Sequence, residues 1–197
     1  MGAGTTRRGL TGPVHGDSLA AETHFGWFAA MWVAKFFIAG VTVAVLTASV
    51  GQSYASSQKG ISAFQRGKYE DALKHLEPAA EKGDPEALYY LGRMYGAGQG
   101  VPKDQNKATA FFKKAAEGGS PGAQQSLGSA LMLGEGIETD MIEALKWFIV
   151  SARAGNKDAA AYAGRVSRFM TRAQQREARK KALAWQKAHE EKKPASN

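Results

Sequence analysis

The stretch Asp84–Gly119 reads DPEALYYLGRMYGAGQGVPKDQNKATAFFKKAAEGG, and the next stretch, Ser120–Gly155, reads SPGAQQSLGSALMLGEGIETDMIEALKWFIVSARAG. The two align without a gap, so every matched pair of residues is 36 positions apart. The matched pairs include Leu91 with Leu127, Gly92 with Gly128, Gly98 with Gly134, Gly100 with Gly136, Asp104 with Asp140, Ala108 with Ala144, and Phe111 with Trp147. Self-similarity at such a period indicates a repeat protein in which each unit is one small group of helices or strands.

The polar residues that recur at fixed phase predict two helices in each unit. Asp84, Ser120 and Asn156 share one phase, and each offers a side-chain oxygen that can cap the free N–H groups at a helix start. Asp104 and Asp140 are placed to cap a second helix in the same way. Each unit is therefore expected to be a helical hairpin.

The recurring glycines predict where the helices approach and where the chain turns. Gly92 and Gly128 fall inside the first helix, where glycine costs about 1 kcal/mol relative to alanine, so close packing of a neighbouring helix must compensate. The Gly-x-Gly pairs that follow allow the backbone to turn towards the second helix. These pairs are Gly98 with Gly100 and Gly134 with Gly136.

The repeat divides most of the chain into a series of units. We predict an all-α fold in which antiparallel helix pairs stack into a short α-solenoid. Its units are 56–83, a degenerate N-terminal repeat; 84–119 and 120–155, two full repeats; and 156–190, a terminal helix pair, before a disordered tail at 191–197. In the terminal pair the first helix is expected from about Lys157 to Met170, with Tyr162, Val166 and Phe169 on its apolar side. The last helix is expected to begin with a capping box, Thr171–Gln174.

The N-terminal region reads as a targeting segment. Residues 36–50 carry no charge and follow Lys35, and they are too few for a span, which needs about 20 apolar residues. Small residues at Ser53 and Ala55 predict cleavage after Ala55, so 31–55 is interpreted as a signal peptide. Residues 1–30 are expected to be disordered or a mis-assigned start, with Met31 as the true start and Met1 as the alternative.

This interpretation places the rest of the protein outside the cytoplasm, in the periplasm or secreted. The main alternative is an uncleaved membrane anchor formed by residues 36–50. A buried core helix is the remaining alternative for the same residues.

The net charge of +8 is concentrated at the C-terminal end. Residues 56–152 hold 11 Lys/Arg against 12 Asp/Glu, whereas residues 153–193 hold 12 against 4. An end repeat needs a polar outer face because no further unit stacks on it, so we interpret the basic residues as a solvated cap. Contact with an anionic membrane or with nucleic acid is the alternative, and we expect no nucleic acid partner for an exported protein.

The sequence offers no catalytic constellation. It has no cysteine, and its four histidines cannot form a metal site with one another, so we expect no metal, no cofactor and no enzymatic activity.

The run from Ala87 to Asp104, ALYYLGRMYGAGQGVPKD, and its continuation through Ala108 and Phe112 to the ending AAEGG at 115–119 carry a family resemblance. They resemble the Sel-one-like repeat, a relative of the tetratricopeptide repeat with a longer loop. The resemblance implies that the α-solenoid of helix pairs is right-handed. It also implies an adaptor or scaffold, often in bacterial envelopes, that binds another protein. A non-catalytic regulator or inhibitor of a cell-envelope or secretion enzyme is the alternative.

A partner is expected on the concave face, which the first helix of each unit lines in such solenoids. The candidate partner-binding residues are Tyr89, Arg93, Gln125, Ser129 and Arg165.

Overall fold

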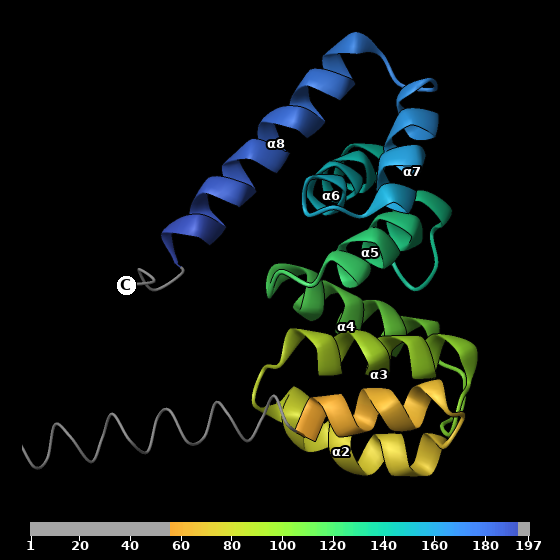
Figure 1. The fold of residues 1–197 in the computed structure, drawn as a ribbon. Coiled ribbons are helices and arrows are strands. Elements are labelled where there is room, and N and C mark those ends of the chain that lie inside the picture. Colours follow the sequence, from red (N-terminus) through yellow and green to blue (C-terminus); the bar gives the residue numbers. More distant parts are fainter. Residues whose placement is uncertain (1–55, 193–197) are drawn as a thin grey trace, which may run out of the picture. The chain divides into compact units, whose positions relative to one another are not determined.

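The computed structural model describes residues 56–192, and all regular structure within this range is helical. A helical segment at 56–65 precedes seven further helices (Figure 1). These are α2 (Tyr69–Glu81), α3 (Pro85–Ala97), α4 (Gln105–Glu117), α5 (Pro121–Leu133), α6 (Met141–Arg153), α7 (Lys157–Ser167) and α8 (Arg172–Glu191). From α2 to α7 each helix packs against the next one in the chain, which confirms the predicted α-solenoid of antiparallel helix pairs.

The predicted capping residues start the helices. The carboxylate of Asp84 accepts hydrogen bonds from the backbone N–H groups of Glu86 and Ala87, at 3.0 and 3.1 Å. The side chains at the other predicted caps accept from the first turn of their own helices in the same way; these residues are Asp104, Ser120, Asp140 and Asn156. Thr171 and Gln174 form the predicted capping box of α8.

Glycine in the first helix of a unit receives a phenylalanine ring from the second helix. A methyl group added at Gly92 would lie 2.6 Å from Cε1 of Phe112, and one added at Gly128 would lie 2.9 Å from Cε1 of Phe148. Both separations are shorter than van der Waals contact, so only glycine lets the paired helices approach this closely. The packing predicted for the two glycines is confirmed.

The Gly-x-Gly loops turn the chain and pack on the preceding unit. All four glycines have φ between +67° and +74°, which favours glycine. A methyl group at Gly100 would lie 2.6 Å from Cβ of Tyr69, and one at Gly136 would clash with the backbone of Gln105. Because Tyr69 and Gln105 are themselves 36 residues apart, the loops repeat the same contact between units.

The other repeated positions form the core. They are almost fully buried in both full units: Leu91, Leu127, Ala108, Ala144 and Trp147. The degenerate first unit also has the predicted form, with a short turn at 66–68 between its two helices.

The last helix departs from the repeat. α8 packs against α6 and makes few contacts with α7, although the two preceding units pair their own helices (Figure 1). The predicted pairing of the two terminal helices is therefore wrong. The apolar stripe of α8 explains the change, because its small residues Ala178 and Ala182 are fully buried and the Trp185 ring packs edge-on against Trp147 of α6, with 5.4 Å between centroids.

Phe169 is a second correction. Its side chain is 85% exposed, whereas Met170 is buried. The first helix of the terminal unit ends at Ser167 rather than near Met170, so the chain leaves the helical spacing that would have placed Phe169 with Tyr162 and Val166.

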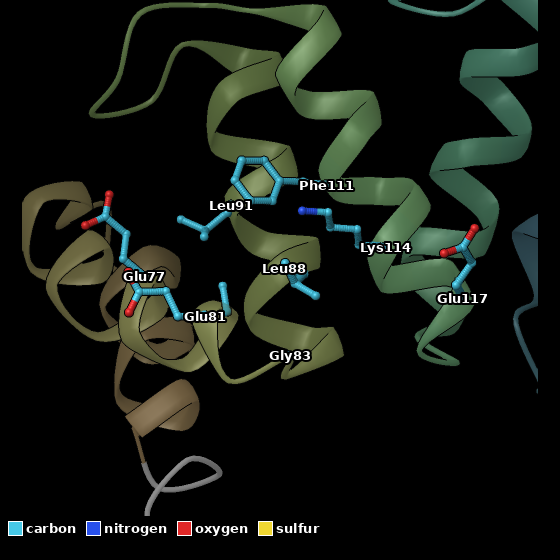
Figure 2. Close-up of a pocket in the computed structure, with 9 residues that line it drawn as sticks. Glu77, Glu81, Gly83, Leu88, Leu91, Phe111, Lys114 and Glu117 are labelled. Carbon is cyan, nitrogen blue, oxygen red and sulfur yellow. The ribbon is translucent and has the colours of Figure 1, made fainter. Parts of the chain in front are cut away.

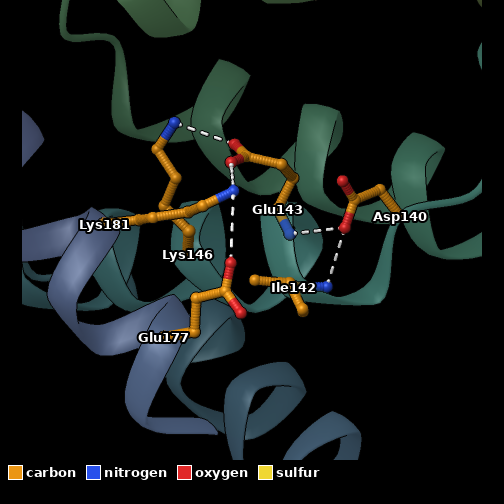
Figure 3. Close-up of polar contacts among 6 residues, drawn as sticks. All are labelled: Asp140, Ile142, Glu143, Lys146, Glu177 and Lys181. Atoms are coloured by element: carbon orange, nitrogen blue, oxygen red, sulfur yellow. Dashed lines mark hydrogen bonds and ion pairs between the residues drawn. The ribbon is translucent and has the colours of Figure 1, made fainter. Parts of the chain in front are cut away.

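A charged cluster fixes α8 on α6 (Figure 3). Glu143 of α6 accepts from Lys181 Nζ of α8 at 2.8 Å and from Lys146 Nζ at 2.9 Å. Burial raises the pKa of the Glu143 carboxyl, but the two lysine hydrogen bonds outweigh burial and hold the pKa below its ordinary value. The same hydrogen bond stabilises the charged form of the lysine and so raises the pKa of Lys181.

The targeting predictions lie outside the described residues. They concern the segments 1–30 and 31–55, cleavage after Ala55 and the anchor at 36–50. Within residues 56–192, no helix combines the length and the apolar character that crossing a bilayer requires. At the other end α8 runs to Glu191, one residue into the predicted tail, and residues 193–197 are not described.

The contrast between Gly128 and Gly164 gives a direct test of the helix packing. Gly164 has the same repeat phase, but nothing lies within 4 Å of a methyl group added there, because α8 does not pair with α7. Gly→Ala gains the same helix propensity at both sites. The difference in free energy of unfolding between Gly128→Ala and Gly164→Ala therefore isolates the overpacking cost at Gly128, about 1–3 kcal/mol. Denaturant unfolding of both variants measures it, and equal stabilities would refute the packing role of Gly128.

Substitution of Glu143 by glutamine is expected to lower stability at neutral pH. A carboxyl whose pKa is lowered by folding stabilises the folded state at every pH above its pKa in the unfolded state. This contribution is lost as the pH falls through its pKa in the folded state. The pair is partly exposed, so we expect a loss of about 0.5–1 kcal/mol at pH 7. Urea unfolding at pH 7 and near pH 3 should show the difference between wild type and Glu143→Gln shrinking at low pH. A difference independent of pH would contradict the ion-pair assignment.

Candidate protein-binding face

The first helices of successive units are linked side by side. Tyr89 of α3 lies against Gly122 of α5, where an added methyl group would come within 2.8 Å of its ring. The amide of Asn156, the residue that caps α7, donates to Oε1 of Gln125 at 3.0 Å. We call the surface formed by Tyr89, Arg93, Gln125, Ser129 and Arg165 the first-helix face.

Arg93 is the centre of an aromatic cluster on this face. Its guanidinium carbon lies 4.8 Å from the ring centroid of Phe64, 5.5 Å from that of Tyr90 and 5.8 Å from that of Tyr89. The Phe64 and Tyr90 rings also pack edge to face, with 5.1 Å between centroids. Arg93 is nevertheless exposed, so an oriented cation is presented to solvent between aromatic surfaces.

Tyr89 is partly a packing residue. Burial raises the pKa of its phenol above the ordinary value, against the lowering effect of the nearby Arg93. Its ring lies 5.2 Å from that of Tyr90 and 6.1 Å from that of Phe112, measured between centroids. Replacing Tyr89 by alanine would therefore disturb the contact between units as well as the surface.

The other candidates differ in how available they are. Gln125 is half-buried and already bonded to Asn156, and Ser129 is half-buried. Arg165 is exposed, with its guanidinium carbon 4.4 Å from the ring centroid of Tyr162 on the same helix. Arg93 and Arg165 are thus the two candidates that combine exposure with an aromatic neighbour.

Phe64, Tyr90 and Asn156 were missed by the sequence analysis. Tyr90 is adjacent to Tyr89 in the sequence and is not among the candidates at the two repeat phases of Tyr89 and Arg93. Phe64 lies 29 residues before Arg93, and its unit lacks the Gly-x-Gly loop that would have fixed the alignment. Asn156 had a readable signal, since an amide cap has a free N–H₂ group that can bond the previous unit.

Residues 56–192 contain no group of three His, Asp or Glu side chains that could hold a metal ion. His75 is half-buried and its Cβ lies beside Gly60 of the first helical segment, so it contributes to packing within the first unit. The chemistry available on the first-helix face is recognition by cation, aromatic and amide groups.

Stacked helix pairs with a glycine in the first helix, a Gly-x-Gly loop and an acidic cap on the second helix define a helical-repeat protein. The Sel1 repeat family model matches residues 55–84, 85–120 and 121–156, which is more than half of the chain. The chain belongs to the Sel1 repeat family, as the resemblance predicted. Proteins of this family generally serve as protein–protein interaction scaffolds and are typically non-catalytic.

Two solved structures show the same architecture. One is a protective antigen from uropathogenic Escherichia coli strains that displays an SLR fold, with 25% identity over 76% of this chain and a TM-score of 0.65. The other is a Sel1 repeat protein from Oxalobacter formigenes, with 34% identity over 56% of this chain and a TM-score of 0.53. The match spans 35% of the first protein's chain and 45% of the second's.

Proposed function

We propose that the protein is an exported adaptor that binds a protein or peptide partner through its first-helix face. The observation that carries the proposal is the exposed guanidinium of Arg93 between the rings of Phe64, Tyr89 and Tyr90. Arginine and tyrosine are enriched among the residues that contribute most to protein interfaces. Because three rings already orient this side chain, less of its conformational entropy remains to be lost on binding.

Export is supported by the fit between the targeting segment and the repeats. The first family match begins at Ala55, the residue after which cleavage is predicted. Removal of the leader there would leave all three matched repeats essentially complete. A tethered adaptor, with residues 36–50 retained as an anchor, is the alternative that the same experiment separates.

The test places a photo-cross-linking amino acid at Ser129 in the full-length protein, expressed in its native host. We expect a discrete cross-linked partner in the envelope fraction. Arg93→Glu should reduce the cross-link several-fold, since it reverses a charge and removes the cation from the aromatic cluster. Lys113→Glu is the matched control, because it makes the same charge change at an exposed position of the second helix α4. Circular dichroism of both variants checks that the helices are retained.

The outcomes are distinct. A cross-link that both variants reduce equally, or that neither reduces, would contradict binding through Arg93. N-terminal sequencing of the recovered protein tests export: a soluble species beginning at Ser56 supports a cleaved signal, and a membrane-bound full-length species supports an anchor. A cytoplasmic species would refute export.

A further inference from the structure

A groove separates α2 from α4 on the side of the molecule formed by second helices (Figure 2). Its volume is about 710 Å³, and Leu88 and Leu91 of α3 form its floor. Ala80 of α2 and Phe111 of α4 extend this apolar surface up the two walls. The groove is distinct from the first-helix face, which uses other positions of α3.

The rim of the groove is predominantly acidic. Glu77 and Glu81 project from α2 and Glu117 from α4, and Lys114 is the one basic residue in the lining (Figure 2). All four side chains are exposed, and none forms an ion pair with another described residue. Glu81 and Glu117 stand in the last turns of their helices, where the helix dipole is also negative. The rim therefore attracts positive charge.

The same groove recurs one unit further along, and there α8 packs along α6 and partly occupies it. A smaller hollow of about 310 Å³ is lined by Gly119, Gln124, Val150, Arg153 and Ala154 together with residues of α8. Four of these repeat residues lie 36 positions after Gly83, Leu88, Lys114 and Glu117, which line the open groove. The structure thus contains one occupied and one open copy of a single groove.

The contacts of α8 show how a helix fits this site. Trp185 packs edge-on against Trp147, and Trp147 has the repeat position of Phe111 in the open groove. His189 reaches the turn at Gly119, and the side chain of Arg153 donates to Gln186. The polar side of α8 is basic, with 6 Lys/Arg against 3 Glu over its length. A helix in the groove is therefore amphipathic, with small apolar residues, one large aromatic side chain and a cationic outer face.

We propose that the open groove between α2 and α4 binds a basic amphipathic helix of another protein. The occupied copy shows how a helix packs in such a groove. The residues that differ between the two copies indicate which kind of helix the open groove prefers. The open groove has Leu88 where the occupied one has Gln124, Glu117 where the occupied one has Arg153, and Lys114 where the occupied one has Val150. Together these exchanges leave the rim of the open groove more acidic than that of the occupied copy, so it favours a helix whose rim is more positive than that of α8.

This inference goes beyond the proposed function, because the groove and the first-helix face use different residues. The probe is a fluorescent peptide with the sequence of residues 171–191, titrated into the purified full-length protein and followed by anisotropy. The protein's own α8 keeps the occupied copy filled, since its attachment gives it an effective concentration near the millimolar range. The open groove is then the copy left for the added peptide.

We expect the peptide to bind saturably, and Glu77→Lys/Glu81→Lys to weaken its affinity about three- to tenfold. The double variant removes two exposed ion pairs with the basic peptide and replaces each attraction by a repulsion. Glu135→Lys/Glu138→Lys is the matched control, with the same charge change at exposed loop positions, and it should leave affinity within about twofold. A scrambled peptide of equal composition should not bind, because it has no apolar stripe. Arg93→Glu should leave peptide binding unchanged, which separates this test from that of the first-helix face.

Three results would overturn the proposal. Absence of peptide binding would remove the groove as a helix site. Equal weakening by the two double variants would show general charge attraction without docking. Self-association of the full-length protein that Glu77→Lys/Glu81→Lys abolishes, measured by sedimentation, would place a second copy in the groove instead of another protein.

Discussion

The close contact between a glycine of the first helix and a phenylalanine ring of the second is the constraint on which each full repeat depends. Phe148 is completely buried on Gly128, and Phe112 makes the equivalent contact at Gly92. The ring sets the distance between the paired helices, and the Gly-x-Gly loop packs the unit on the preceding one. Where the contact is missing, at Gly164, the helix pair is missing as well, and α8 is free to pack elsewhere.

Much of the fold was readable because its determinants are local and recur at one offset. Capping residues such as Asp84 act within their own first turn, and turn glycines such as Gly100 and core positions such as Leu127 are recognised because they recur 36 residues apart. The placement of α8 was not readable in this way. Its stripe of Ala178, Ala182 and Trp185 predicts a buried side, but the choice of α6 over α7 depends on Trp147 and Glu143, which are tertiary partners.

The first-helix face could be predicted only in part from the sequence, because it too depends on tertiary contacts between units. Repeat phase brought Tyr89 and Arg93 to one surface, yet the arginine owes its fixed position to Phe64, which belongs to another unit. The structure also assigns different roles to residues that the sequence treated alike, since Tyr89 supports the contact between units while Arg93 and Arg165 are available to a partner. The first-helix face is a surface that stacking creates and that no single repeat contains.

The central claim, that a partner binds where the first helices meet, is tested most directly by mapping amide chemical shifts of the isotopically labelled protein as the cross-linked partner is added. The account predicts that the largest shifts fall in α3, α5 and α7, with Arg93 and its neighbours foremost. Shifts confined to the second helices α2, α4 and α6, with α3 and α5 unaffected on their exposed sides, would contradict it.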